Sequence, residues 1–340
     1  MQKGFSKLIA IVVVFLIVLG AGGFYISTQT KPADKKIYHI GILSGLGFFL
    51  PTVDGLKEKM TELGYVEGKN VFYDLQKTNF EPEKEKQIIQ KFIDDKVDLM
   101  VIFPTEVSQL AKQMTKDTNI PLVFANAYIE GTGLADSIQK PGANATGVRF
   151  PGVDVTVKRL NFLHELAPNA KRVYMPYAKN YPIIPLLLAE VRKATQVLGM
   201  TLVELPATGA ADIKADLERR EKLSDLGIDV ILFGAEPIGV QPDVMTTVGA
   251  FADKHKLIIG DSFLLSGADI GPLFSYAPDN LIETGGLVAV SIDKIFKGIP
   301  AGNIPVASPE SYLRINYKVA QKLNVKLGEG FLSQAKEILK

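Results

Sequence analysis

The chain has 340 residues, of which 47% are hydrophobic and 22% are charged, which is typical of a folded protein and excludes a disordered one. Its formal net charge of +1 gives no electrostatic reason to expect a nucleic acid as partner. The sequence contains no cysteine, which excludes disulfides, thiolate metal sites, a cysteine nucleophile and a lipid-modified cysteine. The length is sufficient for two domains, each with its own core.

A targeting signal opens the chain, and we predict that residues 1–26 form a signal peptide or a membrane anchor. Residues 8–26 carry no charge, follow two lysines and are long enough to span a bilayer as a helix. Ala21-Gly22-Gly23 offers a cleavage site, but the length of the apolar run favours an uncleaved anchor. We expect an extracytoplasmic protein held at the cytoplasmic membrane by residues 8–26 unless these are removed. The polar residues 27–36 are predicted to be a linker.

Hydrophobic periodicity predicts alternating strands and helices in the next segment. The expected strands are residues 37–43, 70–75, 97–103 and 120–124, and the expected helices follow Thr52, span 81–95 and follow Pro104. The third strand is almost continuously apolar, as expected for a strand covered on both faces in a parallel sheet.

The same plan repeats after a turn-rich seam at residues 141–148, where we expect the chain to cross into a second lobe. Expected strands lie at residues 171–175, 200–205, 228–233 and 257–260, with helices at 183–198 and 211–226. Alternating strands and helices favour parallel sheets with right-handed crossovers. The sequence therefore predicts an α/β fold of two doubly wound parallel-sheet lobes, preceded by the N-terminal apolar helix.

The last segment is too short to bury a core of its own. We expect strands at residues 270–275 and 312–315 and helices at 280–296, 317–323 and 330–339, all packed back onto the lobes. Further crossings between lobes would then make a multi-stranded hinge. The expected lobes are residues 37–146 with about 273–305, and residues 147–272 with about 306–340.

Within the hinge, Asn144 and Thr146 are expected to fix the crossover by local hydrogen bonds. Gly142 and Gly147 are expected to permit its backbone angles.

Ligands of open parallel sheets bind outside the carboxyl ends of the strands. The loops expected there are rich in aromatic and small polar residues, which suit a small organic solute, although packing of the loops alone explains the aromatic residues equally well. The candidate ligand-binding residues are Ser44, Phe48, Phe49, Thr105, Glu106, Asn126, Tyr128, Tyr177, Asn180, Tyr181, Glu236, Asp261 and Tyr276. The acids Glu106, Glu236 and Asp261 could act as acid and base, but a counter-charge for a ligand amine is the simpler role.

The sequence lacks the patterns of common enzymes. Gly41, Gly45 and Gly47 do not follow the dinucleotide-binding order, and no phosphate-binding P-loop is present. The three histidines show neither metal-ligand spacing nor a nucleophile partner. We therefore expect no catalysis, no cofactor and no metal.

Residues 37–340 resemble the ABC-transporter substrate-binding protein family whose better-known members bind tryptophan and other aromatic amino acids. The motifs that carry the resemblance are residues 62–71, 97–101, 120–124, 141–148, 267–268, 276–279 and 315–316. The resemblance implies a type I-like periplasmic-binding-protein fold that closes on a solute and delivers it to a permease and, indirectly, its ATPase.

The chain departs from the family's pattern mainly at the site. Phe49-Leu50-Pro51-Thr52 stands where the family has His-Pro, and Pro104-Thr105 replaces Gly-Thr. The second-lobe loop keeps only Tyr174, Pro176 and Asn180, and the family's later Asp-Asn is replaced around Glu236. The fold therefore carries over from the family, whereas the identity of the ligand does not.

Our leading hypothesis is the extracytoplasmic solute-binding protein of an ABC importer, a monomer with no nucleic-acid partner. The alternative is a membrane-anchored sensor domain that signals through a partner protein. An adjacent permease gene would favour transport, and a kinase or cyclase gene would favour sensing.

Overall fold

The computed structural model describes residues 36–262, 264, 270–278 and 280–340. The signal peptide or anchor and most of the linker lie outside these residues. Among the residues that are described, no helix is long and apolar enough to cross a membrane.

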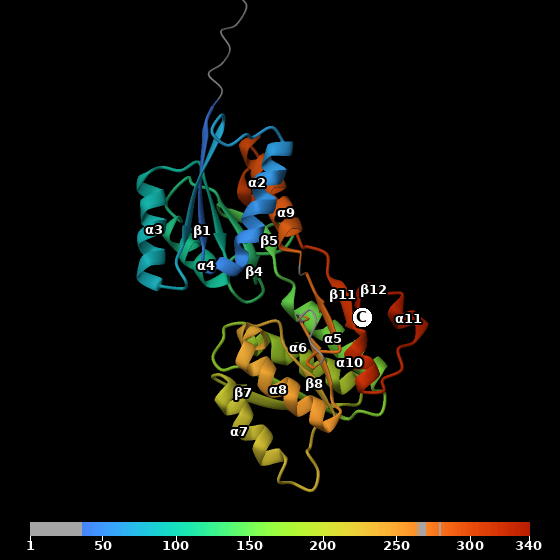
Figure 1. Cartoon of the computed structure of the whole chain (residues 1–340). Helices are drawn as coiled ribbons and strands as arrows, with labels where there is room; N and C mark the ends of the chain where they lie inside the picture. Colours follow the sequence, from blue (N-terminus) through green and yellow to red (C-terminus); the bar gives the residue numbers. More distant parts are fainter. Residues whose placement is uncertain (1–35, 263, 265–269, 279) are drawn as a thin grey trace, which may run out of the picture.

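The first lobe is built on a sheet of five parallel strands in the order β2-β1-β3-β4-β5 (Figure 1). These strands are β1 (Tyr38–Ser44), β2 (Val71–Lys77), β3 (Leu99–Phe103), β4 (Leu122–Ala127) and β5 (Ala145–Arg149). All five residues of β3 are buried, as its apolar run predicts for a central strand covered on both faces. The carboxyl ends of these strands point toward the second lobe.

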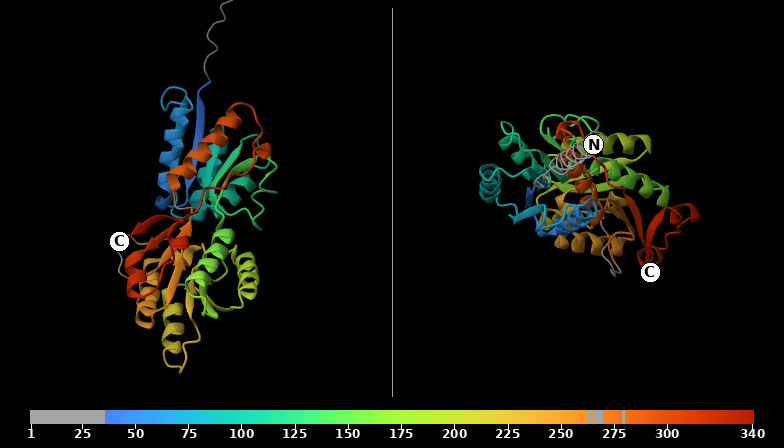
Figure 2. Two further views of the ribbon diagram at one scale, coloured as in Figure 1. Left: turned by 90° about the vertical axis from the view of Figure 1, so that its right-hand side faces the viewer. Right: turned by 90° about the horizontal axis from the view of Figure 1, so that it is seen from above.

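Helices cover both faces of the first sheet. α2 (Leu50–Glu62) and α9 (Leu281–Phe296) pack on one face, and α3 (Pro82–Asp94) and α4 (Thr105–Met114) pack on the other. α9 comes from the far C-terminal part of the chain, yet both views place it alongside α2 (Figures 1 and 2).

Two glycines allow α2 and α9 to touch backbone to backbone. A Cβ atom on Gly285 of α9 would overlap the carbonyl oxygen of Thr52 and the amide nitrogen of Leu56 in α2. A Cβ atom on Gly55 of α2 would likewise overlap the carbonyl oxygen of Ile282. Glycine at both positions therefore fixes the distance at which the returning helix joins the first lobe.

The second lobe is built on a sheet of seven strands in the order β12-β11-β10-β9-β8-β6-β7. β10 and β11 are antiparallel, and the other neighbouring pairs are parallel. The strands are β6 (Arg172–Ala178), β7 (Thr201–Ala207), β8 (Val230–Leu232), β9 (Ile258–Asp261), β10 (Phe274–Ala277), β11 (Tyr312–Asn316) and β12 (Ala335–Leu339).

This sheet is also enclosed by helices. α5 (Gly152–Leu166), α6 (Ile184–Val197) and the short α10 (Tyr317–Lys322) and α11 (Glu329–Leu332) contribute to one apolar core. α7 (Ala210–Arg220) and α8 (Pro242–His255) contribute to the core on the other face. Each lobe is thus a doubly wound α/β unit, as predicted.

The chain crosses between the lobes three times, after β5, after β10 and after the 3-10 helix η3 (Ala301–Asn303). The first and third crossings are joined by hydrogen bonds. The amide of Ala307 donates to Gly147 O at 2.9 Å, and the amide of Arg149 donates to Ala307 O at 2.9 Å. The buried hydroxyl of Thr146 donates to Ile304 O at 2.8 Å. The predicted multi-stranded connection between the lobes is present.

The boundaries differ from the expected ones at two places. β5 pairs with β4, so the seam ends the first sheet and residues 147–149 belong to the first lobe. A Cβ atom on Gly147 would overlap Phe124 O, so this glycine permits close strand pairing and not merely a turn. β10 pairs with β9 and β11, which places residues 274–277 in the second lobe and not in the first.

The main wrong prediction of secondary structure concerns the C-terminal segment. Residues 330–339 were expected to form one helix, but α11 ends at Leu332 and β12 follows as an edge strand beside β11. Only Phe331 of α11 is buried, so one turn suffices to anchor it, and β11 offers unpaired backbone groups to the residues that follow. α7 also ends at Arg220, six residues earlier than expected.

Candidate functional site

A cluster of buried and half-buried polar side chains forms where the two lobes meet. It draws on the ends of β4, β6 and β9, on the loop after β8, and on α4 and α5. Strand ends and helix starts are the expected place for a ligand in this architecture. We call this set the interlobe cluster, and its members are Glu106, Tyr128, Arg159, Tyr181, Glu236, Asp261 and Ser262.

Arg159 is the cation of the interlobe cluster. It projects from α5 and is completely buried. Its Nη1 donates to Phe233 O, and its Nε donates to Val155 O at 3.3 Å, while Nη2 donates to the hydroxyl of Thr156 at 3.3 Å. Burial lowers the pKa of Arg159 to about 10, while the nearby Asp261, Tyr128 and Glu236 favour its charge. The guanidinium therefore stays protonated at neutral pH.

Asp261 ends β9 and is 1% exposed. Its Oδ1 accepts a hydrogen bond from the amide of Ser262, whereas Oδ2 has no hydrogen-bond partner among the described residues. Burial raises the pKa of Asp261 to about 7, and the charge of Arg159 works against this rise. The carboxyl thus keeps one oxygen available in a buried position.

Glu236 follows β8 and caps the 3-10 helix η2 (Pro237–Val240). Its Oε2 accepts hydrogen bonds from the amides of Ile238 at 3.0 Å and Ala178 at 3.2 Å. Its Oε1 is buried and has no partner within the described part of the chain. Burial raises the pKa of Glu236 to about 7, opposed chiefly by those two amides. Asp261 and Glu236 therefore share one arrangement: one oxygen fixed by backbone, the other free.

The first lobe contributes Tyr128, which follows β4. Its amide donates to the hydroxyl oxygen of Thr105 at 3.0 Å, and its ring packs edge-to-face on Phe150. A Cβ atom on Gly152 would overlap its hydroxyl, so the start of α5 receives this side chain only because residue 152 is glycine. The hydroxyl oxygen is buried without a partner among the described residues. Burial raises the pKa of Tyr128 well above its usual value.

Tyr181 and Glu106 face each other across the boundary between the two lobes. Tyr181 follows β6 in the second lobe, and Glu106 lies in the first turn of α4 in the first lobe. Burial, and after it the negative charge of the nearby Glu106, raise the pKa of Tyr181. The side chains of Tyr181 and Glu106 therefore lie near each other across the boundary between the lobes.

Four of the predicted residues meet in the interlobe cluster besides Glu106: Tyr128, Tyr181, Glu236 and Asp261. Arg159 and Ser262 were missed. The signal for Arg159 was a charged residue in line with Val155 and Leu163 on the apolar face of an amphipathic helix, a position where burial requires polar partners.

The other predicted first-lobe residues are engaged within their own lobe. The hydroxyl of Ser44 donates to Leu46 O at 2.6 Å, and Asn126 donates to the hydroxyl of Thr52 at 3.1 Å. Phe49 packs edge-to-face on Phe103, and Phe48 packs on Phe49 while remaining 55% exposed. Thr105 positions the backbone of Tyr128. Their role as ligand contacts stays a prediction.

Three predicted second-lobe residues lie outside the interlobe cluster. β6 extends to Ala178, so Tyr177 is a strand residue beside Glu204 and Arg192. Tyr276 lies within β10 and packs edge-to-face on Phe162 in the core. Asn180 is exposed in a turn with a φ of 66°.

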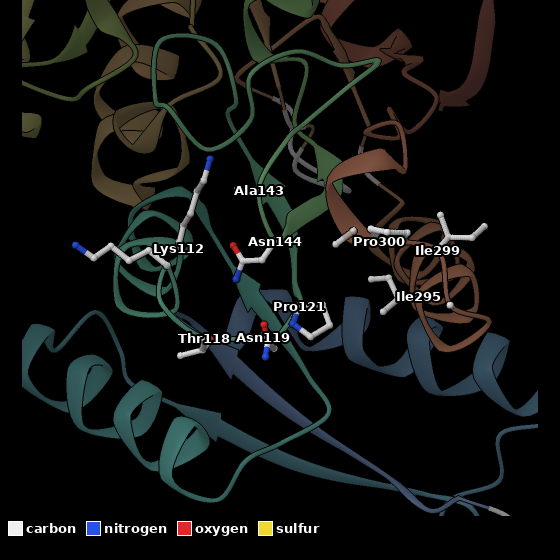
Figure 3. Close-up of a pocket in the computed structure, with 12 residues that line it drawn as sticks. Lys112, Thr118, Asn119, Pro121, Ala143, Asn144, Ile295, Ile299 and Pro300 are labelled. Carbon is white, nitrogen blue, oxygen red and sulfur yellow. The ribbon is translucent and has the colours of Figure 1, made fainter.

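A separate groove of about 550 Å³ lies at the opposite end of the first lobe (Figure 3). It is bounded by the end of α4, the residue before β4, the residues before β5 and the end of α9, which place it at the amino ends of the strands. Its lining residues are Lys112, Lys116, Thr118, Asn119, Pro121, Ala143, Asn144, Ile295, Gly298, Ile299, Pro300 and Ala301. The groove shares no residue with the interlobe cluster. In its wall, Asn144 donates to Thr115 Oγ1 at 3.1 Å and to Ile120 O at 2.8 Å, so its hydrogen bonds hold the seam to the first lobe.

The family model described as ABC transporter substrate binding protein matches residues 40–339. The chain belongs to this family. The resemblance drawn from the sequence motifs is thus confirmed, and with it the expectation that the protein is a solute-binding protein and not an enzyme.

A curated protein and several solved structures are also similar to this chain. A tyrosine-binding protein of Clostridioides difficile (strain R20291) is 31% identical over 157 residues, which is 44% of this chain and 44% of that protein. The chain thus aligns with less than half of the length of this curated relative.

The substrate-binding protein also matches solved structures along most of its length. An ABC domain in complex with L-Trp from Streptococcus pneumonia has a TM-score of 0.74 at 21% identity, covering 89% of this chain and all of that one. The ligand-free, open structure of a substrate-binding protein with adhesive properties from Clostridium difficile has a TM-score of 0.70 at 22% identity, covering 88% and 99%. These likenesses establish the two-lobed periplasmic-binding-protein fold.

Proposed function

We propose that this protein captures a small amino-acid-like solute between its lobes and presents it to the permease of an ABC importer. The observation that carries the proposal is the pair of buried carboxyl groups, Glu236 and Asp261, each with one oxygen free in the interlobe cluster. Buried polar atoms without partners are rare in folded proteins because each costs free energy, on the order of 1–3 kcal/mol. A ligand that pairs with them recovers that free energy.

The chemistry of the free atoms favours an amino acid. The ammonium group of a solute has three N–H donors, enough to bond both Glu236 Oε1 and Asp261 Oδ2. The hydroxyls of Ser262 and Tyr128 can donate hydrogen bonds to a solute carboxylate, and both oxygens are buried without partners among the described residues. The guanidinium of Arg159 keeps the region from becoming strongly negative.

Aromatic amino acids are the first candidates. Phe150, Tyr128 and Tyr181 bring aromatic rings to the boundary of the lobes, where they can contact an apolar side chain. A tyrosine-binding protein among the relatives and L-Trp in a structural neighbour support the same class of solute.

Transport requires that the solute-bound form differ from the empty one. The three crossings form a hinge about which the lobes can close, and a hydrogen bond from the Tyr181 hydroxyl to the nearby Glu106, formed on closure, would stabilise the closed form. We propose that the permease recognises this form outside the cytoplasm, where substrate-binding proteins of ABC transporters act. Asn144, Thr146 and Gly147 would set the geometry of the first crossing.

Calorimetric titration of the purified protein tests the proposal. L-Tyrosine and L-tryptophan should bind saturably, and tyramine, which lacks the carboxylate, should bind more weakly. 3-(4-Hydroxyphenyl)propionate, which lacks only the ammonium, should bind at least about tenfold more weakly than L-tyrosine, because a hydrogen bond to a charged group contributes about 1.5–3 kcal/mol. Equal binding of the compounds with and without the ammonium would contradict the proposal, as would the absence of saturable binding for every amino acid.

A further inference from the structure

The interlobe cluster holds more carboxyl groups than cations. Glu236 lies in the loop after β8 and Asp261 ends the neighbouring strand β9, and the charge of Asp261 contributes to raising the pKa of Glu236. Both are more than nine-tenths buried. Each has one oxygen held by backbone amides and one oxygen without a partner among the described residues.

Arg159 cannot neutralise both groups. It is the cation whose charge acts on both carboxyls in the described structure. Its guanidinium nitrogens donate to Phe233 O, Val155 O and the hydroxyl of Thr156, and no hydrogen bond joins it to either carboxyl. If both carboxyls were ionised, these two groups and Arg159 would together carry one negative charge in excess.

The other groups that face the pair do not supply a positive charge. Tyr128 faces it from the first lobe and Tyr181 from the loop after β6, while the acids Glu106 and Glu130 act on these two tyrosines. An excess charge in a buried site is costly, and a carboxyl group avoids this cost by keeping its proton. The pKa values of Glu236 and Asp261, both raised to about 7 by burial, agree with this outcome.

We infer that solute binding expels a proton, because the ammonium group of the solute takes the place of a proton that the empty site keeps on the Glu236–Asp261 pair. This inference rests on the function proposed above. On binding, the O–H bond of the carboxylic acid breaks and its proton passes to solvent, while the carboxylate accepts N–H hydrogen bonds from the ammonium. No electrons are transferred, and beside the two carboxyl groups the positive charge of the ammonium replaces that of the released proton.

The exchange makes the affinity depend on pH. Each proton released on binding weakens the affinity about tenfold for each pH unit of acidification below the pKa of the empty site. The protein should therefore hold its solute at slightly alkaline pH and release it in acid. A solute that carries no ammonium should show no such dependence.

Calorimetry can measure the number of protons released on binding. L-Tyrosine and L-tryptophan are titrated in two buffers of different ionisation enthalpy, phosphate and imidazole. At about pH 6, below the pKa of the empty site, the observed binding enthalpies should differ between the buffers by the amount that corresponds to release of about one proton. The dissociation constant should be at least about tenfold higher near pH 6 than near pH 8.

Two variants test whether the released proton comes from the Glu236–Asp261 pair. Asp261→Asn removes one carboxyl and should reduce the number of protons released. Asp293→Asn is the matched control, because Asp293 is also buried but lies in α9 and is hydrogen-bonded to the hydroxyl of Tyr65 and to Lys297. It should release as many protons as the wild type. If Asp261→Asn binds the solute too weakly to measure, the comparison between buffers for the wild type tests by itself whether a proton is released.

The outcomes separate this inference from the proposed function. Saturable binding with equal enthalpies in both buffers would overturn the proton exchange and leave the binding of amino acids standing. Absence of saturable binding by L-tyrosine, L-tryptophan and tyramine at both pH values would overturn both.

Discussion

At the residue scale, the behaviour of the site follows from where two carboxyl groups are buried. The sequence identified Glu236 and Asp261 because both follow apolar strands of the second lobe, and strand ends gather at one edge of a parallel sheet. It could not show that one oxygen of each would be fixed by a backbone amide, because those bonds depend on loop geometry. The sequence also did not predict that Tyr177 and Tyr276 would lie within strands.

Burial of these carboxyls should make the empty protein less stable at alkaline pH. A carboxyl whose pKa is raised by folding binds more protons in the folded than in the unfolded state, so its contribution to stability is present in acid and is lost as the pH rises through about 7. The melting temperature of the ligand-free protein should fall between about pH 5.5 and pH 8, a range in which ordinary carboxyls are already ionised.

The variant Asp261→Asn should be more stable than the wild type near pH 8 and should approach the wild type only near pH 4, where the aspartate of the unfolded chain also becomes protonated. The expected difference is on the order of a few kcal/mol, since one unit of pKa shift corresponds to about 1.4 kcal/mol. Thermal unfolding followed by circular dichroism measures it. Parallel pH profiles for the two proteins would show that Asp261 is not protonated in the empty site.

At the element scale, strands and helices with strong periodicity were predicted close to their observed bounds. β3 and α3 are examples, with a continuous apolar run in one and an apolar stripe in the other. The wrong predictions concern segments whose structure depends on pairing with a neighbouring strand. β12 is a strand because β11 leaves an edge to pair with, and β5 joins the first sheet because Gly147 permits close pairing with β4.

The backbone contact between α2 and α9 was not predictable from either segment alone, and it leads to a stability prediction. Gly285→Val should destabilise the protein by about 1–3 kcal/mol, because a side chain there overlaps the backbone of Thr52 and Leu56. Gly286→Ala is the matched control, since nothing lies within 4 Å of a Cβ atom at that position. It should stabilise the helix by about 0.5–1 kcal/mol.

Urea unfolding of both variants measures the two changes in the free energy of unfolding. Similar effects of Gly285→Val and Gly286→Ala would contradict the view that Gly285 sets the distance between α2 and α9.

At the scale of the whole molecule, two lobes connected by three crossings bring together residues that are far apart in the sequence. The sequence predicted both lobes and the multiple crossings from the repeated plan and the short C-terminal segment. The position of the first crossing, after β5 and not within the seam, depends on pairing between β4 and β5 that no local pattern reveals. The interlobe cluster exists only because the crossings hold Tyr128 and Glu106 opposite Arg159 and Tyr181.

The central claim is that an amino-acid-like solute binds between the lobes through its ammonium group. A crystal structure of the protein grown with L-tyrosine or L-tryptophan tests it most directly. We expect the ammonium nitrogen within about 3 Å of both Asp261 Oδ2 and Glu236 Oε1, with the aromatic ring beside Tyr128 or Tyr181. A solute bound with its ammonium away from both carboxyls, or in the groove beside Pro121 and Ile299, would contradict the account.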